Sequence, residues 1–125
     1  MKKYGKSLEA QQKRSLWRHF SAYIKARDNY KCFTCGRIAR GQAMHAGHFI
    51  PKGAGGIALY FNEDNVHAQC AGCNLFLAGN QHEYGKRLGE KMVAELYKIK
   101  QQITKNFPYE ERIAYYKKKL SNLDK

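Results

Sequence analysis

The sequence predicts an α+β fold in which a short β-containing centre, residues 32–80, lies between two helical flanks. Three observations lead to this prediction. Apolar side chains recur at helical spacing both before and after the centre. The centre is rich in glycine and contains short segments of strand-like pattern. Two Cys-x2-Cys pairs lie within it, and a single domain of 125 residues, with only a modest core, gains stability from such a cross-link.

The N-terminal flank, residues 1–31, is predicted to form a basic helical arm. Its helix spans 8–27 and begins at Ser7, whose side chain is a good acceptor for the unpaired amides of a first turn. The pair Asp28-Asn29 then ends the helix as a turn. The apolar stripe of this helix consists of Leu16, Trp17, Phe20, Tyr23 and Ile24.

The centre is predicted to contain two strands and one brief helix. The strands are expected near 43–50 and 57–61, with a loop from Pro51 to Gly56 between them. The helix is expected to begin near Cys73 and to stop at Gly79.

The C-terminal flank, residues 81–125, is predicted to form two basic helices. Asn80 has Glu83 three residues later, a capping-box pattern that starts a helix predicted over 81–104. Pro108 suits the first turn of the last helix. The apolar stripes contain Tyr84, Leu88, Met92, Leu96, Ile99 and Ile103 in the first helix, and Tyr109, Ile113, Tyr116 and Leu120 in the second.

The net charge of +13 indicates an anionic partner, and nucleic acid is the main candidate. Residues 1–31 carry +7, residues 86–125 carry +6, and residues 32–85 sum to zero. The alternative is that these charges belong to solvated helix faces. A hydrophobic share of 43% excludes a disordered basic tail, and no apolar run approaches the roughly 20 residues of a membrane span. Without an apolar signal region we expect a cytoplasmic protein of a bacterium or a phage-infected cell.

The four cysteines form two knuckles, Cys32-x2-Cys35 and Cys70-x2-Cys73, with 34 residues between them. Such pairs turn both sulfurs toward one point, and two pairs complete a tetrahedral site that suits structural Zn²⁺. The alternatives are two disulfides, a redox pair or iron in the same site. A site with four protein ligands has no open position, so this zinc is not expected to be catalytic.

Chemistry of another kind is indicated between the knuckles, where His45, His48, Asn65 and Asn74 occur. An imidazole at a strand end can take a proton from water, and a divalent ion on a nearby oxygen ligand can stabilise charge on a phosphate. A lone histidine is more often structural than catalytic. Its place beside a zinc knuckle in a strongly basic chain favours phosphodiester hydrolysis.

The order of motifs resembles that of HNH endonucleases, which have the ββα-metal or His-Me finger. The motifs are Cys-x2-Cys, Gly-His-Phe-Ile-Pro, Gly-Gly, Asp-Asn-Val and Cys-x2-Cys-Asn. With the segment from Asn74 to Leu88 included, the chain resembles the Rap/NinG group of phage recombination endonucleases. It is also similar to phage endonuclease VII resolvases, in which a four-cysteine zinc site frames the finger. The resemblance covers about residues 27–100 and implies a zinc-braced ββα-metal core.

The resemblance implies roles for individual residues. His48 corresponds to the general base, Asn65 to the asparagine that holds the loop, and Asn74 to the ligand of a catalytic Mg²⁺ or Mn²⁺. The four cysteines correspond to the zinc ligands. Many HNH enzymes have an acidic metal ligand just before the catalytic histidine, whereas this chain has Gly47 there.

Because of Gly47, the metal would depend on Asn74, phosphate oxygens and waters. His45 is expected to be a further metal ligand, a group that supports the ligands, or a strand residue packed near the zinc knuckle. Asn80 has a sufficient role as an N-cap, although it could also face the metal cleft. The only basic residues of the neutral middle are Arg37, Arg40 and Lys52, and we expect them to contact DNA phosphates.

The resulting hypothesis is a metal-dependent DNA endonuclease that leaves 5′-phosphate and 3′-hydroxyl ends. Rap/NinG resemblance implies branched recombination intermediates such as Holliday junctions or D-loops, and paired cuts make a homodimer plausible. The alternatives are a sequence-directed or nonspecific HNH nuclease, a non-catalytic zinc DNA-binding module, and an RNA-binding zinc ribbon.

Overall fold

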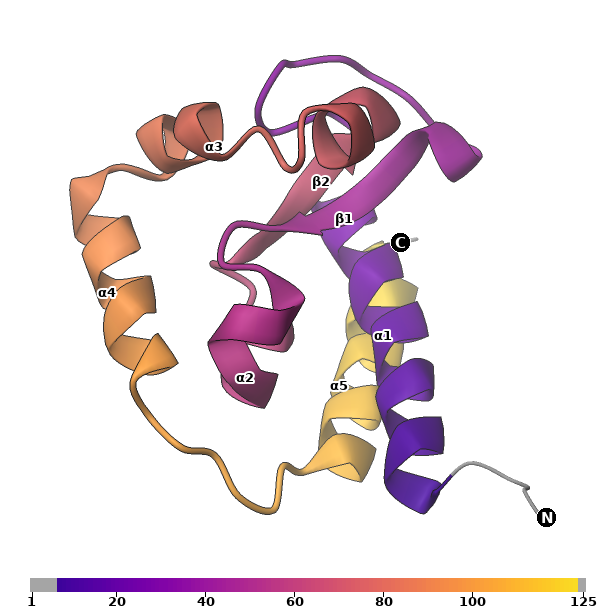
Figure 1. The fold of residues 1–125 in the computed structure, drawn as a ribbon. Helices are drawn as coiled ribbons and strands as arrows, with labels where there is room; N and C mark the ends of the chain where they lie inside the picture. The colour runs from indigo at the N-terminus through magenta and orange to yellow at the C-terminus, as the bar shows by residue number, and fades with distance from the viewer. Residues whose placement is uncertain (1–6, 124–125) are drawn as a thin grey trace, which may run out of the picture.

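The computed structural model describes residues 7–123, which form a mixed α+β arrangement with one small sheet among helices (Figure 1). In these residues, no helix has both the length and the hydrophobicity needed to cross a membrane. The helices and strands are α1 (Leu8–Arg27), β1 (Met44–His48), α2 (Lys52–Tyr60), β2 (Val66–Cys70), α3 (Gln81–Leu88), α4 (Glu90–Lys100) and α5 (Tyr109–Leu123), with a 3-10 turn η1 (Gly41–Ala43) and a π-helical turn η2 (Gly72–Phe76).

The sheet consists of β1 and β2, which pair antiparallel. His45 lies opposite Gln69, Gly47 opposite His67, and His48 opposite Val66. Alternate residues of a strand point to opposite faces of a sheet. His45 and Gly47 therefore face η2, while Ala46 and His48 face α1, as shown by the contacts of His45 with η2 and of His48 with α1.

The first helix forms as the sequence predicts, from Leu8 to Arg27, and Ser7 caps it by accepting the Ala10 amide at 3.1 Å. Its stripe packs against α5, where the rings of Phe20 and Tyr116 meet edge to face with centroids 5.0 Å apart. Figure 1 shows α1 and α5 side by side. The basic helices α1 and α5 therefore form one pair rather than separate arms.

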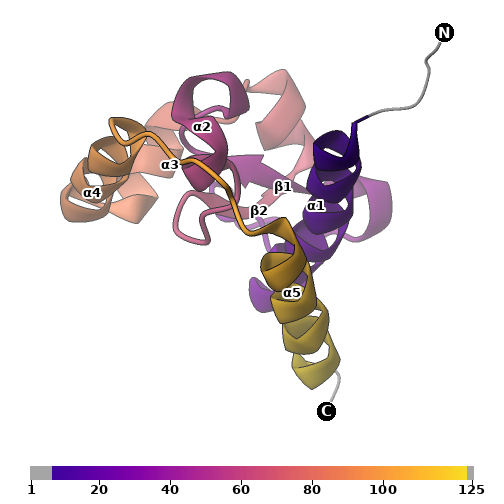
Figure 2. The same ribbon diagram turned by 90° about the horizontal axis from the view of Figure 1, so that it is seen from below.

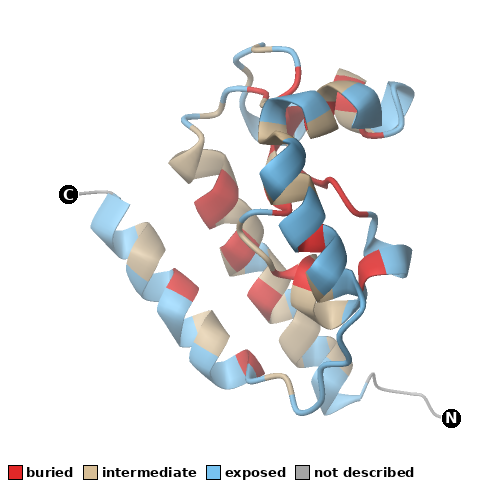
Figure 3. Cartoon of the chain, turned by 90° about the vertical axis from the view of Figure 1, so that its left-hand side faces the viewer, coloured by how far each residue is buried: buried red, intermediate tan, exposed pale blue. Residues whose placement is uncertain are grey.

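A second apolar cluster lies beneath α2, α3 and α4. Its buried members are Phe49, Ile50, Leu59, Tyr84 and Leu96. The outer surface of α4 is mostly exposed in Figure 3, and Figure 2 shows α4 well apart from α5. The basic C-terminal flank is thus divided between two sides of the molecule.

The predicted strand at 57–61 is wrong, because these residues belong to α2 and its C-terminal end. The partner of β1 is instead β2, which leads directly into the second knuckle. The predicted loop from Pro51 to Gly56 is also mostly helical, with a kink at Gly56, where φ is 74°. The error arises because the apolar residues of a short run show no periodicity that distinguishes a strand from a buried helix.

The predicted helix over 81–104 is interrupted at Gly89 and ends at Lys100. Gly89 has φ 90° and ψ 155°, so the backbone changes direction there while the apolar stripe continues into the same cluster. Ile103, expected in this stripe, lies beyond the helix and is exposed. Asn80 precedes α3 in the left-handed conformation and makes no side-chain cap bond, so the capping box does not form.

Candidate functional site

The four cysteines of the two knuckles meet in one cluster. Their sulfur atoms all lie within 4.8 Å of one another, and the Sγ atoms of Cys35 and Cys70 are 3.7 Å apart. Zn–S bonds of about 2.3 Å in a tetrahedron would place neighbouring sulfurs about 3.8 Å apart. The donor set and its spacing therefore suit one tetrahedral Zn²⁺, with Cys35 exposed and the other three cysteines buried.

Hydrogen-bond donors surround these sulfurs. The Asn80 side chain donates to Cys73 Sγ at 3.6 Å, which is the contact that replaces its predicted capping bond. Burial acts to raise the pKa of Cys32, but the Thr34 hydroxyl and nearby backbone amides outweigh it and lower that pKa to about 6. Metal binding requires thiolates, so this environment favours the form of Cys32 that binds zinc.

His48 ends β1 and is only 8% exposed. His48 Nε2 lies 2.9 Å from the backbone carbonyl oxygen of Tyr60. A carbonyl oxygen can only accept a hydrogen bond, so Nε2 is the donor and Nδ1 is left as the basic nitrogen. The ring stacks on Trp17 of α1, with centroids 5.3 Å apart. Burial, together with the charge of Lys52, lowers the pKa of His48 to about 4. The imidazole is therefore neutral at pH 7 and can accept a proton.

Asn65 is fully buried and connects the segment before α2 to the last turn of α2. Its Oδ1 accepts the Ile50 amide at 2.8 Å, and its Nδ2 donates to the carbonyl oxygens of Ile50 and Leu59. Leu59 immediately precedes Tyr60, whose carbonyl holds His48. Asn65 thus fixes the backbone that orients the His48 ring, which matches the loop-holding position inferred from the sequence.

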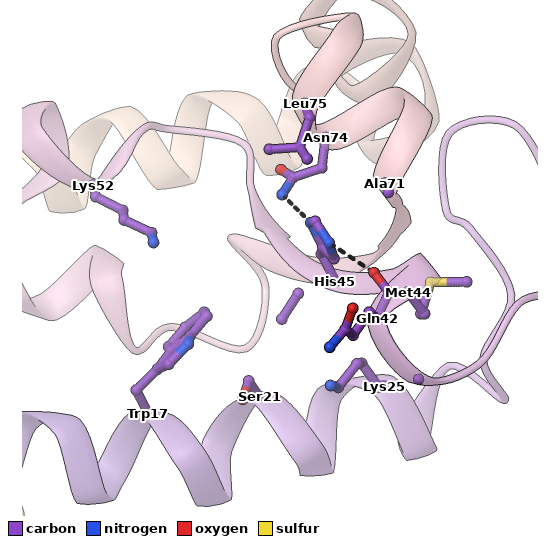
Figure 4. A pocket seen from close by; sticks show the side chains of 12 residues that line it. Trp17, Ser21, Lys25, Gln42, Met44, His45, Lys52, Ala71, Asn74 and Leu75 are labelled. Atoms are coloured by element: carbon purple, nitrogen blue, oxygen red, sulfur yellow. Dashed lines mark hydrogen bonds between the residues drawn. The ribbon is translucent and has the colours of Figure 1, made fainter.

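Asn74 lies on η2, and its orientation is set by His45 (Figure 4). Asn74 Nδ2 donates to His45 Nδ1 at 2.9 Å, while His45 Nε2 donates to the backbone carbonyl oxygen of Gln42 at 3.1 Å. Both nitrogens of His45 are therefore engaged within the protein. This geometry favours a role for His45 in orienting Asn74, whose Oδ1 remains available for another partner.

Two adjoining clefts bring these groups together, and Asn74 and Lys52 line both. The larger, of about 840 Å³, also has Trp17, Lys25 and His45 in its wall, and the smaller, of about 360 Å³, has His48. Figure 4 shows the α1 side chains reaching toward β1 and η2 across the larger cleft. His48 and Asn74, which the sequence predicts to form one site, thus both line the smaller cleft, together with the cationic side chain of Lys52.

The other predicted phosphate contacts lie elsewhere. Arg37 is exposed on the first knuckle, where its carbonyl oxygen accepts the Cys32 amide. Arg40 is exposed too, and its guanidinium lies over the Tyr30 ring, 4.2 Å from the centroid. Among the described residues that line the two clefts, neither arginine occurs.

Sequence reasoning missed two contributors from α1. Trp17 was assigned to the apolar stripe, and it does pack on the core, but it also covers His48. Lys25 lies outside the predicted stripe and lines the larger cleft. Helical periodicity could identify the face that each residue occupies, but it gave no indication that β1 would lie across from it.

The family model described as "Bacteriophage Lambda NinG protein" matches residues 2–125. This chain belongs to the NinG family. The chain is 36% identical over 81 residues to protein ninG of Escherichia phage lambda, a match that covers 61% of this chain and 39% of the relative. Protein ninG of Salmonella phage P22 is 36% identical over 73 residues, or 58% of this chain and 35% of the relative. This NinG-family chain therefore spans well under half of these curated relatives. No solved structure matches it.

The comparisons confirm the NinG part of the resemblance and the link to phage proteins. The two-stranded sheet and the cysteine cluster confirm a mixed α+β chain with a candidate zinc site.

Proposed function

We propose that this NinG-family chain is a metal-dependent DNA endonuclease built on a ββα-metal core, with β1, β2 and η2 as the finger. One observation carries the proposal. His48 is held neutral, with its Nε2 bonded to the Tyr60 carbonyl, in the same cleft as the free oxygen of Asn74. A base with one nitrogen fixed and the other basic is what activation of a water molecule requires.

The reaction proposed for this site is hydrolysis of a phosphodiester. His48 Nδ1 takes a proton from a water molecule, whose oxygen forms a bond to phosphorus as the bond to the 3′ oxygen breaks, and a second water molecule protonates that departing oxygen. The products carry 5′-phosphate and 3′-hydroxyl ends. The ammonium group of Lys52, which lies in both clefts, would hold the phosphate beside His48.

Asn74 Oδ1 is the residue atom that would hold Mg²⁺ or Mn²⁺ in this site. Both ions prefer oxygen ligands, and the His45 bond to Nδ2 leaves the Asn74 oxygen free. When bound, such an ion supplies stabilisation of negative charge on the phosphate and on the departing oxygen.

We further propose branched recombination intermediates as the preferred DNA. The charge of +13 supports binding to phosphates, and membership of a phage family whose resemblance implies recombination chemistry supports the branched substrate. A dimer would allow paired cuts at a four-way junction. The rival functions, a zinc module that binds DNA without cutting and a nuclease without preference for branches, are outcomes of the test below.

The test compares cleavage of a synthetic four-way junction with cleavage of a linear duplex of the same sequence. Each assay is run with Mg²⁺, with Mn²⁺ and with neither, and zinc content is measured on every preparation. We expect metal-dependent cutting of the junction, and we expect His48→Ala to reduce its rate by about 10²- to 10⁴-fold while DNA binding and zinc content are retained.

His82→Ala, at an exposed position in α3, is the matched control and should cut at the wild-type rate. Cutting by His48→Ala at the wild-type rate would remove the assigned base. Binding without any cutting would favour the zinc module, and equal rates on junction and duplex would remove the structural preference.

A further inference from the structure

Gln69 of β2 has a buried amide oxygen that lacks a partner. Its side chain is fully buried, and Nε2 donates to the Gly79 carbonyl at 2.8 Å and to the Thr34 hydroxyl at 3.2 Å. Because a carbonyl must receive a donor, the Gly79 contact fixes which end of the amide is nitrogen. Among the buried side-chain polar atoms of residues 7–123, Gln69 Oε1 alone has no hydrogen-bond partner.

This oxygen lies against Gly47, the residue just before His48. A Cβ atom on Gly47 would overlap Gln69 Oε1 and would lie 3.0 Å from Asn74 Oδ1. The two amide oxygens therefore converge on the space that a side chain at position 47 would occupy. They come from two different elements, β2 and η2, and neither oxygen has a described hydrogen-bond partner.

We infer that Gln69 Oε1 and Asn74 Oδ1 together hold the divalent cation, with the Gln69 oxygen in place of a carboxylate at position 47. The inference rests on the proposed function, because it supplies the second protein ligand of the cation proposed there. Amide carbonyl oxygens are ordinary ligands of hard cations. Gln69 Oε1 is closed off from solvent, so a rotation of the half-buried Asn74 side chain must open the space between the two oxygens.

The charge of such a site has a consequence for binding order. Two amide oxygens carry no net charge, so the protein alone attracts a divalent ion less than a site with a carboxylate does. A DNA phosphate beside Lys52 would add the missing negative charge. The cation should therefore bind more tightly when DNA is present than when it is absent.

The test measures Mn²⁺ binding directly. Zinc-loaded protein is titrated with Mn²⁺, and the unbound Mn²⁺ is followed by its electron paramagnetic resonance signal. It is done without DNA and with a junction made uncleavable by phosphorothioate linkages. Gln69→Leu should weaken Mn²⁺ binding at least tenfold in the presence of this DNA. Gln12→Leu, the same change on α1 away from both clefts, should leave the affinity unchanged.

A ligand exchange keeps the test decisive if Gln69→Leu loses its zinc or its fold. Gly47→Asp together with Gln69→Ala places a carboxylate in the space that the amide vacates, and should bind Mn²⁺ at least as tightly as the wild type. Gln69→Ala alone should bind at least tenfold more weakly than the wild type.

A folded Gln69→Leu protein with wild-type Mn²⁺ affinity would overturn the inference, as would a double variant that binds no better than Gln69→Ala. If the wild type cuts DNA while these results are negative, the proposed function stands and only the role of Gln69 falls. A wild type that neither binds Mn²⁺ nor cuts DNA would overturn both.

Discussion

Two histidines, the buried His48 and the half-buried His67, make the fold sensitive to acid. His48 lies against Trp17, and His67 stacks on Phe33 with ring centroids 4.1 Å apart. Burial disfavours the charged imidazole, and it lowers the pKa of each ring to about 4. Near His67 the charge of Arg27 acts in the same direction, while that of Asp28 opposes it.

The direction of the pH effect follows from these pKa values. Between about pH 6.5, the usual histidine pKa, and pH 4, the unfolded chain binds protons that the folded chain does not. The stability that neutral histidines provide is complete above this range and is lost as the pH falls through it. For each unit by which the pH falls in this range, each histidine should reduce the free energy of unfolding by up to about 1.4 kcal/mol.

We therefore predict that His67→Gln weakens the pH dependence of stability between pH 6.5 and 5. The measurement is urea unfolding at several pH values, which gives the slope of the free energy of unfolding against pH for each protein. Slopes are compared because loss of zinc in acid affects both proteins alike. The exposed His82 provides the control, since His82→Gln should keep the wild-type slope. Identical slopes for His67→Gln and the wild type would contradict the prediction.

The sequence was informative about residues whose chemistry follows a motif. The cysteine spacing predicted a four-sulfur cluster, and the motif order predicted that His48 and Asn74 would share a site; both sets lie together. Gln69 belongs to no motif, and the role proposed for it depends on the absence of a side chain on Gly47 of the neighbouring strand. A relation between two strands could not be inferred before their register was known.

At the scale of elements, apolar periodicity predicted packing better than it predicted backbone path. The stripe Tyr84, Leu88, Met92, Leu96 and Ile99 does join one cluster. The helix that was expected to carry it is nevertheless two helices, because Gly89 adopts a backbone conformation that side-chain spacing cannot reveal. In α1, by contrast, Ser7 and Asp28 supply clear end signals, and both ends were predicted correctly.

Gly89 should resist substitution for this reason. Its φ of 90° and ψ of 155° lie in a region that is essentially restricted to glycine, so Gly89→Ala should cost about 1–3 kcal/mol of stability. There is open space around its Cβ position, so strain of the backbone is the expected cause. Thermal and urea unfolding of the zinc-loaded protein measure the effect.

Gly53 provides the matched comparison within a helix. It has open space around its Cβ position and lies in the first turn of α2 without a positive φ. Gly53→Ala should therefore leave stability unchanged or raise it by about 0.5–1 kcal/mol. If Gly89→Ala were equally harmless, the junction between α3 and α4 would not depend on glycine.

At the scale of the whole molecule, folding changes the meaning of the charge distribution. The sequence has basic flanks around a neutral centre, but α1 and α5 pack together and α4 lies apart from them. The cleft with His45 and Asn74 is lined from α1 by Trp17, Ser21 and Lys25. Arg14 and Arg18 lie on the same side of the helix as Ser21 and Lys25, at spacings of three or four residues, so one basic face of α1 leads into the cleft.

This arrangement predicts which charges contact DNA. If about six phosphates are neutralised, log affinity should fall with log salt concentration at a slope near −5. Arg14→Ala combined with Arg18→Ala should weaken binding and make that slope shallower by about 2, because each lost phosphate contact removes about one unit. Both side chains are exposed, so their removal should not affect folding.

The control is Lys91→Ala with Lys98→Ala, which removes the same charge from exposed positions of α4. Because α4 lies on the other side of the molecule, this pair should leave the slope within about one unit of the wild-type value. Fluorescence anisotropy of labelled junction DNA over a range of KCl concentrations measures all three proteins. Equal effects of the two pairs would mean that DNA contacts the molecule without regard to the cleft. A wild-type slope near zero would mean that the charge of +13 serves solubility alone.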